Sequence, residues 1–291
     1  MAKRERRKNL KMEINDVLQS RCRFGESRHA AKAAGTSGQG IYSYTTYHVY
    51  QQQCHRFAAW IREHHPEAKN LHDAFQHINR YLQSMIDEEL SPYTIKTAAS
   101  ALGKLYQCKT TEWIKTPKRN KENITKNRNR NLNNKHWNPT NHPDEVEFMS
   151  ACGLRRNELK SLRGSWCIQL EDGRWYIDLT HTSSTKGGKP RMVPIVSDNI
   201  DLIVKMCKDA GEGKVFPTGI SKHCNVHRYR AMYCKRVYDT YARDLKTLSR
   251  KEIYYCRGNS KKYDKAALRK CSNALGHERT SVVAANYSYM M

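Results

Sequence analysis

The chain has 291 residues, and its 52 Lys and Arg residues against 28 Asp and Glu residues give a net charge of +24. Such an excess, spread over the whole length, repels itself in a compact fold and indicates a polyanionic partner, of which nucleic acid is the commonest. The length suits two ordinary domains. No apolar run approaches the ~18 residues of a spanning helix, and the stretch MAKRERRKNLKMEIND is too polar for a signal peptide, so we expect no membrane association.

The cysteines bear on the cellular compartment and on metal binding. With no secretory segment, the ten cysteines are typical of reduced thiols in a cytoplasm. His223, Cys224 and His227 are close in sequence, but no CxxC pair accompanies them, and structural zinc sites normally have four paired ligands. We therefore expect no metal and no cofactor.

Three amphipathic helices are predicted in the first part of the chain. Larger or less polar side chains recur every three or four residues over 46–61 and again over 71–85, the second series being Leu71, Phe75, Ile78, Leu82 and Met85. Ser91-Pro92 supplies an N-cap and a rigid first turn for a third helix, which buries Ile95, Ala99, Leu102 and Tyr106. These elements predict a helical domain over residues 1–115.

A basic connector is predicted next, over residues 116–141. The segment is dense in Asn, Lys and Arg and too poor in apolar residues to pack a core. It is either a solvated spacer or a strap that lies along phosphates.

The remaining chain, 142–291, predicts a second domain. DEVEFMSAC reads as a helix that Gly153 stops, and LRRNELKSL starts another. CIQLEDGRWYIDLT holds two short strands around an Asp-Gly turn, and RMVPIV is a third after a Lys-Gly-Gly-Lys turn. Helices follow from Ile200, from Asn225 to about Leu245, and from Asp264 onward. The fold class is mainly α with a small antiparallel sheet (α+β).

Several basic side chains are candidates for an anion site. Arg155 falls in the first turn of a helix, where it either binds an anion or pairs with Glu158 three residues later. His227 and Arg230 share one helix face and can grip the same phosphate, although a solvated face explains each alone. Lys186 lies on the glycine-rich turn STKGGKPR, which can approach a ligand closely.

Taken in order, GLRRNEL, the turn lysine, HRYR, LGH and a tyrosine near the end resemble the tyrosine recombinase (phage integrase) family of site-specific DNA recombinases. The resemblance covers about 144–287 closely, and the helical first half resembles a core-binding domain that clamps DNA only in general character. It implies that Glu158 fixes the first arginine and that the catalytic residues are Arg155, Lys186, His227, Arg230, His277 and Tyr287.

The chemistry fits those residue types. Two guanidinium groups match the charge that a phosphodiester spreads over its nonbridging oxygens. A tyrosine hydroxyl costs about 4 kcal/mol to ionise at pH 7, so it needs a proton acceptor and a positive field. A hairpin lysine can protonate the departing 5′ oxygen. By spacing alone, Tyr289 is a rival nucleophile two residues beyond Tyr287. We read residues 246–263 as an inserted basic loop or hairpin.

The resemblance implies a site-specific recombinase or integrase that cleaves and rejoins double-stranded DNA at specific recombination sites through a 3′-phosphotyrosyl intermediate and a Holliday junction. It further implies a homo-tetramer on DNA in the cytoplasm, associated with a nucleoid and of prokaryotic or phage origin. Two alternatives stay open, a type IB topoisomerase and a noncatalytic DNA-binding protein.

Overall fold

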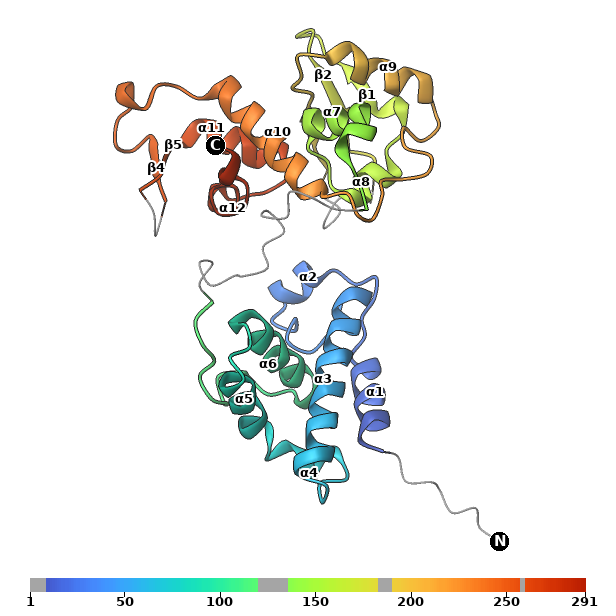
Figure 1. Ribbon diagram of the computed structural model, residues 1–291, viewed down its shortest axis with the longest axis vertical. Helices are drawn as coiled ribbons and strands as arrows, with labels where there is room; N and C mark the ends of the chain where they lie inside the picture. Colours follow the sequence, from blue (N-terminus) through green and yellow to red (C-terminus); the bar gives the residue numbers. More distant parts are fainter. Residues whose placement is uncertain (1–8, 120–135, 183–189, 257–259) are drawn as a thin grey trace. The chain divides into compact units, whose positions relative to one another are not determined.

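The computed structural model describes residues 9–119, 136–182, 190–256 and 260–291. The chain divides into two compact units, Met1–Thr125 and Lys126–Met291, which Figure 1 shows as a helical part and a mixed part. The division falls inside the predicted linker 116–141, of which residues 120–135 lie outside the described residues, so the linker and the domain limits stay predictions. Within the described ranges, every helix is too short or too polar to cross a membrane.

The first unit is all helical. Its described helices are α1 (Leu10–Ser20), α2 (Arg28–Ala33), α3 (Tyr44–His64), α4 (Leu71–Phe75), α5 (Ile78–Asp87) and α6 (Pro92–Tyr106). The long α3 packs against α1 and α6, and α5 also packs against α6. Phe57 and Ile61 of α3 and Leu102 of α6 are fully buried in this core. The predicted start of α6 is confirmed, since the backbone N–H of Tyr93 donates to Oγ of Ser91 at 3.3 Å.

Two features of this unit differ from the sequence prediction. The single helix expected over 71–85 is broken at Gln76 and His77 into α4 and α5. In α4 it is Ala74 that is buried, while Phe75 is 44% exposed. A break that returns Ile78 to the core leaves the spacing of apolar residues intact, so periodicity alone does not detect it. The helices α1 and α2 were not predicted.

The second unit combines helices with two small antiparallel sheets. Its helices and strands are α7 (Pro143–Cys152), α8 (Arg156–Ser161), β1 (Cys167–Gln169), β2 (Trp175–Asp178), β3 (Met192–Pro194), α9 (Ile200–Ala210), α10 (Val226–Tyr241), β4 (Ile253–Tyr255), β5 (Lys262–Asp264), α11 (Lys265–Ala274) and α12 (Thr280–Asn286). The strands β1, β2 and β3 form an antiparallel sheet in that order, with Ile177 opposite Val193 and both side chains buried. The predicted fold class and the three-stranded sheet are confirmed.

A second hairpin occupies part of the predicted insertion. Strands β4 and β5 pair antiparallel, so the basic insertion over 246–263 contains a hairpin. Asp264 is the last residue of this hairpin and the N-cap of α11. Its buried carboxylate accepts from the backbone N–H of Ala266 at 2.8 Å and from Nε of Arg243 at 2.8 Å. The preceding helix α10 ends at Tyr241 rather than near Leu245. The hydrogen bonds of Asp264 fix where α11 begins.

A tight turn joins α7 to α8 and lies against α10. Gly153 ends α7 with φ of +55°, a left-handed conformation that favours glycine. A Cβ atom there would lie 2.1 Å from the ring of Tyr233 on α10, so the position has neither the conformation nor the space for a side chain. The helix α10 packs against both α7 and α11. One helix, α10, therefore holds both α7 and α11 in place.

Candidate active site

Arg155 lies immediately before α8, as its N-cap residue, rather than inside the first turn as predicted. Its backbone N–H donates to Oε2 of Glu158 at 2.7 Å, and its Nη1 donates to Oε1 of the same carboxylate at 2.9 Å. Nη2 donates to the carbonyl oxygens of Leu275 at 3.0 Å and Gly276 at 3.3 Å. The guanidinium group therefore bridges α8 and the turn after α11.

The carboxylate of Glu158 is fully buried and binds a second arginine. Arg191, next to β3, donates from Nη1 to Oε1 at 3.0 Å and from Nη2 to Oε2 at 2.7 Å. Burial by itself raises the pKa of Glu158, but the hydrogen bonds and charge of Arg191 and then of Arg155 outweigh it and lower that pKa to about 2. The carboxylate is ionised at neutral pH and holds both guanidinium groups.

Arg230 is the most enclosed of the arginines, with 1% of its surface exposed. It lies in the second turn of α10, and its Nη1 donates to the carbonyl oxygen of Gly153. Its Nη2 donates to the carbonyl oxygen of Leu275 at 3.1 Å and to the hydroxyl oxygen of Tyr287 at 3.4 Å. Burial lowers the pKa of Arg230 below its ordinary value, and the proximity of Tyr287 opposes that effect.

Tyr287 follows the last residue of α12, and its side chain is turned inward with only 4% of its surface exposed. Its hydroxyl oxygen lies 3.3 Å from Nε2 of His277, while the ring lies under the guanidinium of Arg230 with 5.7 Å between Cζ and the ring centroid. His277 is half-buried, and its backbone is tied to Ser272 by hydrogen bonds of 2.7 and 2.8 Å. A phenol is thus placed between an imidazole and a guanidinium.

The other candidates are placed less closely or not described. His227 is exposed one turn before Arg230 on α10, and the centroid of its ring lies 6.5 Å from that of Tyr287. Lys186 lies outside the described residues, in the segment between β2 and β3. The rival Tyr289 is 37% exposed, in a short 3-10 turn after α12, and burial raises its pKa to about 12. The structure therefore brings together Arg155, Arg230, His277 and Tyr287, and the ring of His227 is stacked near that of Tyr287.

The arrangement carries an excess of positive charge. Three guanidinium groups, those of Arg155, Arg191 and Arg230, surround the single carboxylate of Glu158. Nε of Arg191 and Nε of Arg230 are buried and have no hydrogen-bond partner among the described residues. Buried cations and unpartnered donors are costly unless an anion approaches them. The arrangement can bind a phosphate and polarise it beside the hydroxyl of Tyr287.

Arg191 is the member of this cluster that the sequence analysis did not single out. It stands at the start of the RMVPIV stretch, which reads only as a strand. Its side chain is 9% exposed and lies against Gly276, where a Cβ atom would come within 3.0 Å of Nη1. A basic residue directly before a predicted strand was the available signal, since a charge that is drawn toward the core needs a partner.

Comparison of the amino-acid sequence with known proteins finds no match. No model of a protein family matches the chain, and no curated protein matches it. Two solved structures are similar over 94% of this chain and 94% of theirs. Both are DNA complexes of the Tn1549 transposon integrase. One, with circular intermediate DNA, is 10% identical with a TM-score of 0.45. The other, a variant with transposon right end DNA, is 12% identical with a TM-score of 0.43.

Proposed function

We propose that the chain is a site-specific DNA recombinase of the tyrosine type, which cleaves and rejoins duplex DNA through a covalent 3′-phosphotyrosyl intermediate. The observation that carries this proposal is the position of the Tyr287 hydroxyl, 3.4 Å from Nη2 of Arg230 and 3.3 Å from Nε2 of His277. The order of the sequence motifs and the net charge of +24 support DNA as the substrate.

In the proposed reaction, the Tyr287 oxygen attacks the phosphorus and the bond from phosphorus to the 5′ oxygen breaks. The tyrosine proton passes to a neighbouring base, for which the Nε2 of His277 has the required reach. Arg155 and Arg230 neutralise the charge that develops on the nonbridging oxygens. The departing 5′ oxygen takes a proton, a role that we assign to Lys186. Attack by a 5′ hydroxyl on the ester reverses each step, so no nucleotide cofactor is consumed.

The bonding of the arginines supports their assignment as an anion clamp. Both Arg155 and Arg230 donate from Nη2 to the carbonyl oxygen of Leu275, at 3.0 and 3.1 Å, so the two guanidinium groups converge on one point. A bound phosphate oxygen would be a stronger acceptor for these donors than a neutral carbonyl. The opposing charge of Glu158 fixes Arg155 without neutralising the cluster as a whole.

The test uses DNA that the protein itself selects. Duplexes recovered from a random-sequence pool by binding to the full chain are rebuilt with a nick beside each possible scissile phosphate, so that the short 5′-hydroxyl fragment diffuses away after cleavage. We expect a covalent adduct that resists denaturant and carries DNA through its 3′ phosphate. Tight binding with no adduct at any nick position would contradict the proposal and favour a noncatalytic DNA-binding protein.

The same experiment separates recombination from relaxation. A recombinase should select one repeated sequence and should join strands between two copies of it. A type IB topoisomerase would form the adduct on unrelated sequences and relax supercoiled plasmids without exchanging strands. We expect exchange that depends on the selected sequence and passes through a four-way junction, with the protein acting as a tetramer.

A further inference from the structure

Two histidines and a glutamate meet in the first unit, away from the chemistry proposed above. His65 is the C-cap residue directly after α3, Glu67 follows in the connection to α4, and His77 immediately precedes α5. The backbone break between α4 and α5, which the periodicity did not predict, places the side chain of His77 beside that of His65. Three elements of the helical unit therefore contribute to one cluster, which we call the His65–Glu67–His77 cluster.

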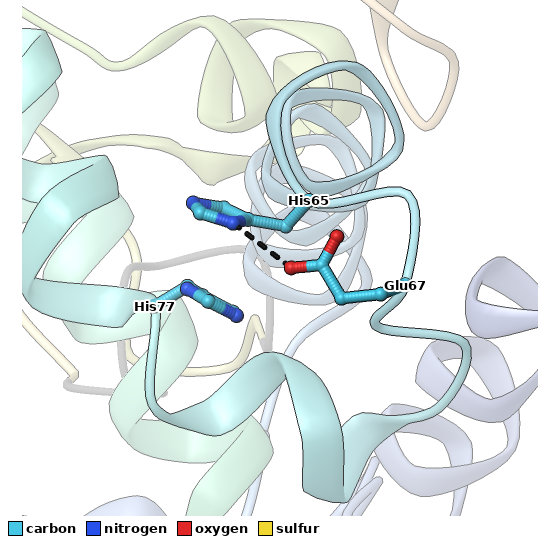
Figure 2. Close-up of side chains that lie close together, drawn as sticks. All are labelled: His65, Glu67 and His77. Atoms are coloured by element: carbon cyan, nitrogen blue, oxygen red, sulfur yellow. Dashed lines mark hydrogen bonds and ion pairs between the residues drawn. The ribbon is translucent and has the colours of Figure 1, made fainter.

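The geometry of this cluster is compact. The rings of His65 and His77 are stacked with centroids 3.6 Å apart, and Nδ1 of His65 lies 3.2 Å from Oε1 of Glu67. Figure 2 shows the two rings facing each other, with the carboxylate of Glu67 beside them. One ligand atom from each residue can be chosen so that all three lie within 4.8 Å of one another. Two ligands of a tetrahedral zinc ion at about 2.0 Å from the metal are about 3.3 Å apart. Because the lone pair of an imidazole nitrogen lies in the plane of its ring, the two stacked rings must rotate out of their stack for both nitrogens to face one ion.

His77 supplies an independent reason for expecting a ligand. Its side chain is buried, with 7% of its surface exposed, and its Nε2 has no hydrogen-bond partner among the described residues. A buried ring nitrogen left in this state costs free energy that a bound group would recover.

We propose that the His65–Glu67–His77 cluster binds one divalent transition-metal ion of the zinc class. Imidazole nitrogens with one carboxylate suit Zn²⁺, and also Co²⁺ and Ni²⁺, better than the oxygen-only sets that Ca²⁺ and Mg²⁺ prefer. Three protein ligands leave a position for water, and Glu67, whose side chain is 68% exposed, lies on the solvent side of the cluster. Among the described residues, His223, Cys224 and His227 form no comparable group.

The ion would act as a clamp on the helical unit. It would join the end of α3 to the start of α5 across the connection 66–76, which holds α4 between them. Because an unfolded chain does not hold these ligands together, metal binding would stabilise the folded unit in proportion to the logarithm of the free metal concentration. The inference does not depend on the proposed recombinase activity.

The test measures metal binding and not DNA cleavage. The full chain is stripped with chelator, dialysed and titrated with Zn²⁺ by calorimetry and with Co²⁺ by visible absorption. We expect one site per chain whose Co²⁺ spectrum lacks the near-ultraviolet thiolate band, so that binding to the free cysteines is recognised separately. The melting temperature should rise with added Zn²⁺.

Variants assign the site. Glu67→Gln alters an exposed side chain and keeps the fold, and it should weaken Zn²⁺ binding at least tenfold, as should His77→Ala. Glu63→Gln and His72→Ala change exposed residues of the same types nearby and should leave the affinity unchanged. The proposal is overturned if wild type binds no Zn²⁺ at 100 µM, a concentration on the order of a weak site. It is also overturned if Glu67→Gln binds as tightly as wild type, whether or not His77→Ala folds.

Discussion

The hydroxyl oxygen of Tyr287 lies 3.3 Å from Nε2 of His277, although the two residues are ten positions apart and separated by the helix α12. The turn at Gly276, with φ of +67°, sends the chain from α11 toward α12, and the helix then ends one residue before the tyrosine. The end of the chain is therefore folded back onto the arginines.

Arg230→Lys should lower the rate of strand cleavage at least about 100-fold while DNA affinity changes only a few-fold. Lysine keeps the charge but loses the planar fork, in which Nη1 donates to Gly153 while Nη2 donates to Leu275 and Tyr287. Single-turnover cleavage and fluorescence anisotropy measure the two quantities. Arg236→Lys is the matched control, because Arg236 lies on the same helix but pairs with Glu147, and it should cleave at the wild-type rate. Equal losses in both variants would contradict a special role for Arg230.

Gly153→Ala should destabilise the second unit far more than Gly173→Ala. Both glycines have positive φ, of +55° and +76°, so both alanines carry a conformational cost of about 1 kcal/mol. A Cβ atom at 153 would also lie 2.1 Å from the ring of Tyr233, whereas nothing lies within 4 Å of one at 173. We expect the overpacking to add about 1–3 kcal/mol. Urea unfolding measures both, and equal losses would show that the turn adapts to the extra methyl group.

Glu158→Gln should lower the free energy of unfolding at neutral pH, and should change it little at pH 2. The pKa of Glu158 is about 2 in the folded protein against an ordinary value of 4.5. The stabilisation is therefore complete above about pH 4.5 and is lost as the pH falls toward 2, and the difference corresponds to about 3 kcal/mol. Urea unfolding of wild type and variant from pH 7 to pH 2 should show two curves that converge in acid. A constant difference would mean that the carboxylate charge does not hold Arg155 and Arg191.

Binding to duplex DNA should weaken steeply with salt, because a chain of net charge +24 displaces counterions from the phosphates it contacts. A plot of the logarithm of the association constant against the logarithm of salt concentration should be linear with a slope that reflects several released ions. Fluorescence anisotropy titrations between about 50 and 200 mM salt measure this slope. A slope near zero would mean that the excess charge does not face DNA.

Much of this architecture was predictable because the governing patterns are local. Ser91 and Pro92 mark the start of α6, Gly153 marks the end of α7, and the turns around Asp172-Gly173 separate strands of the sheet. The motifs around Arg155, Arg230, His277 and Tyr287 were found in the sequence for the same reason, although their catalytic roles stay predictions. Each motif is a short run with a recognisable spacing.

The parts that sequence reasoning missed depend on contacts between distant segments. Arg191 and Glu158 are 33 positions apart, and the pairing of β3 with β2 sets their approach. The break before His77 leaves the apolar spacing unchanged, so the stacking of His77 on His65 has no periodic signal. Whether two side chains meet across a turn is decided by the packing of whole elements, which a single sequence does not display.

The identity of the nucleophile is the most direct test of the account. Wild type, Tyr287→Phe and Tyr289→Phe are incubated with the nicked DNA that the protein selects, and the trapped adduct is digested and sequenced by mass spectrometry. We expect the nucleotide on Tyr287, a normal adduct from Tyr289→Phe, and no adduct from Tyr287→Phe despite unchanged DNA binding, because that variant lacks only the attacking oxygen. A nucleotide on Tyr289, or an adduct that persists in Tyr287→Phe, would contradict the account.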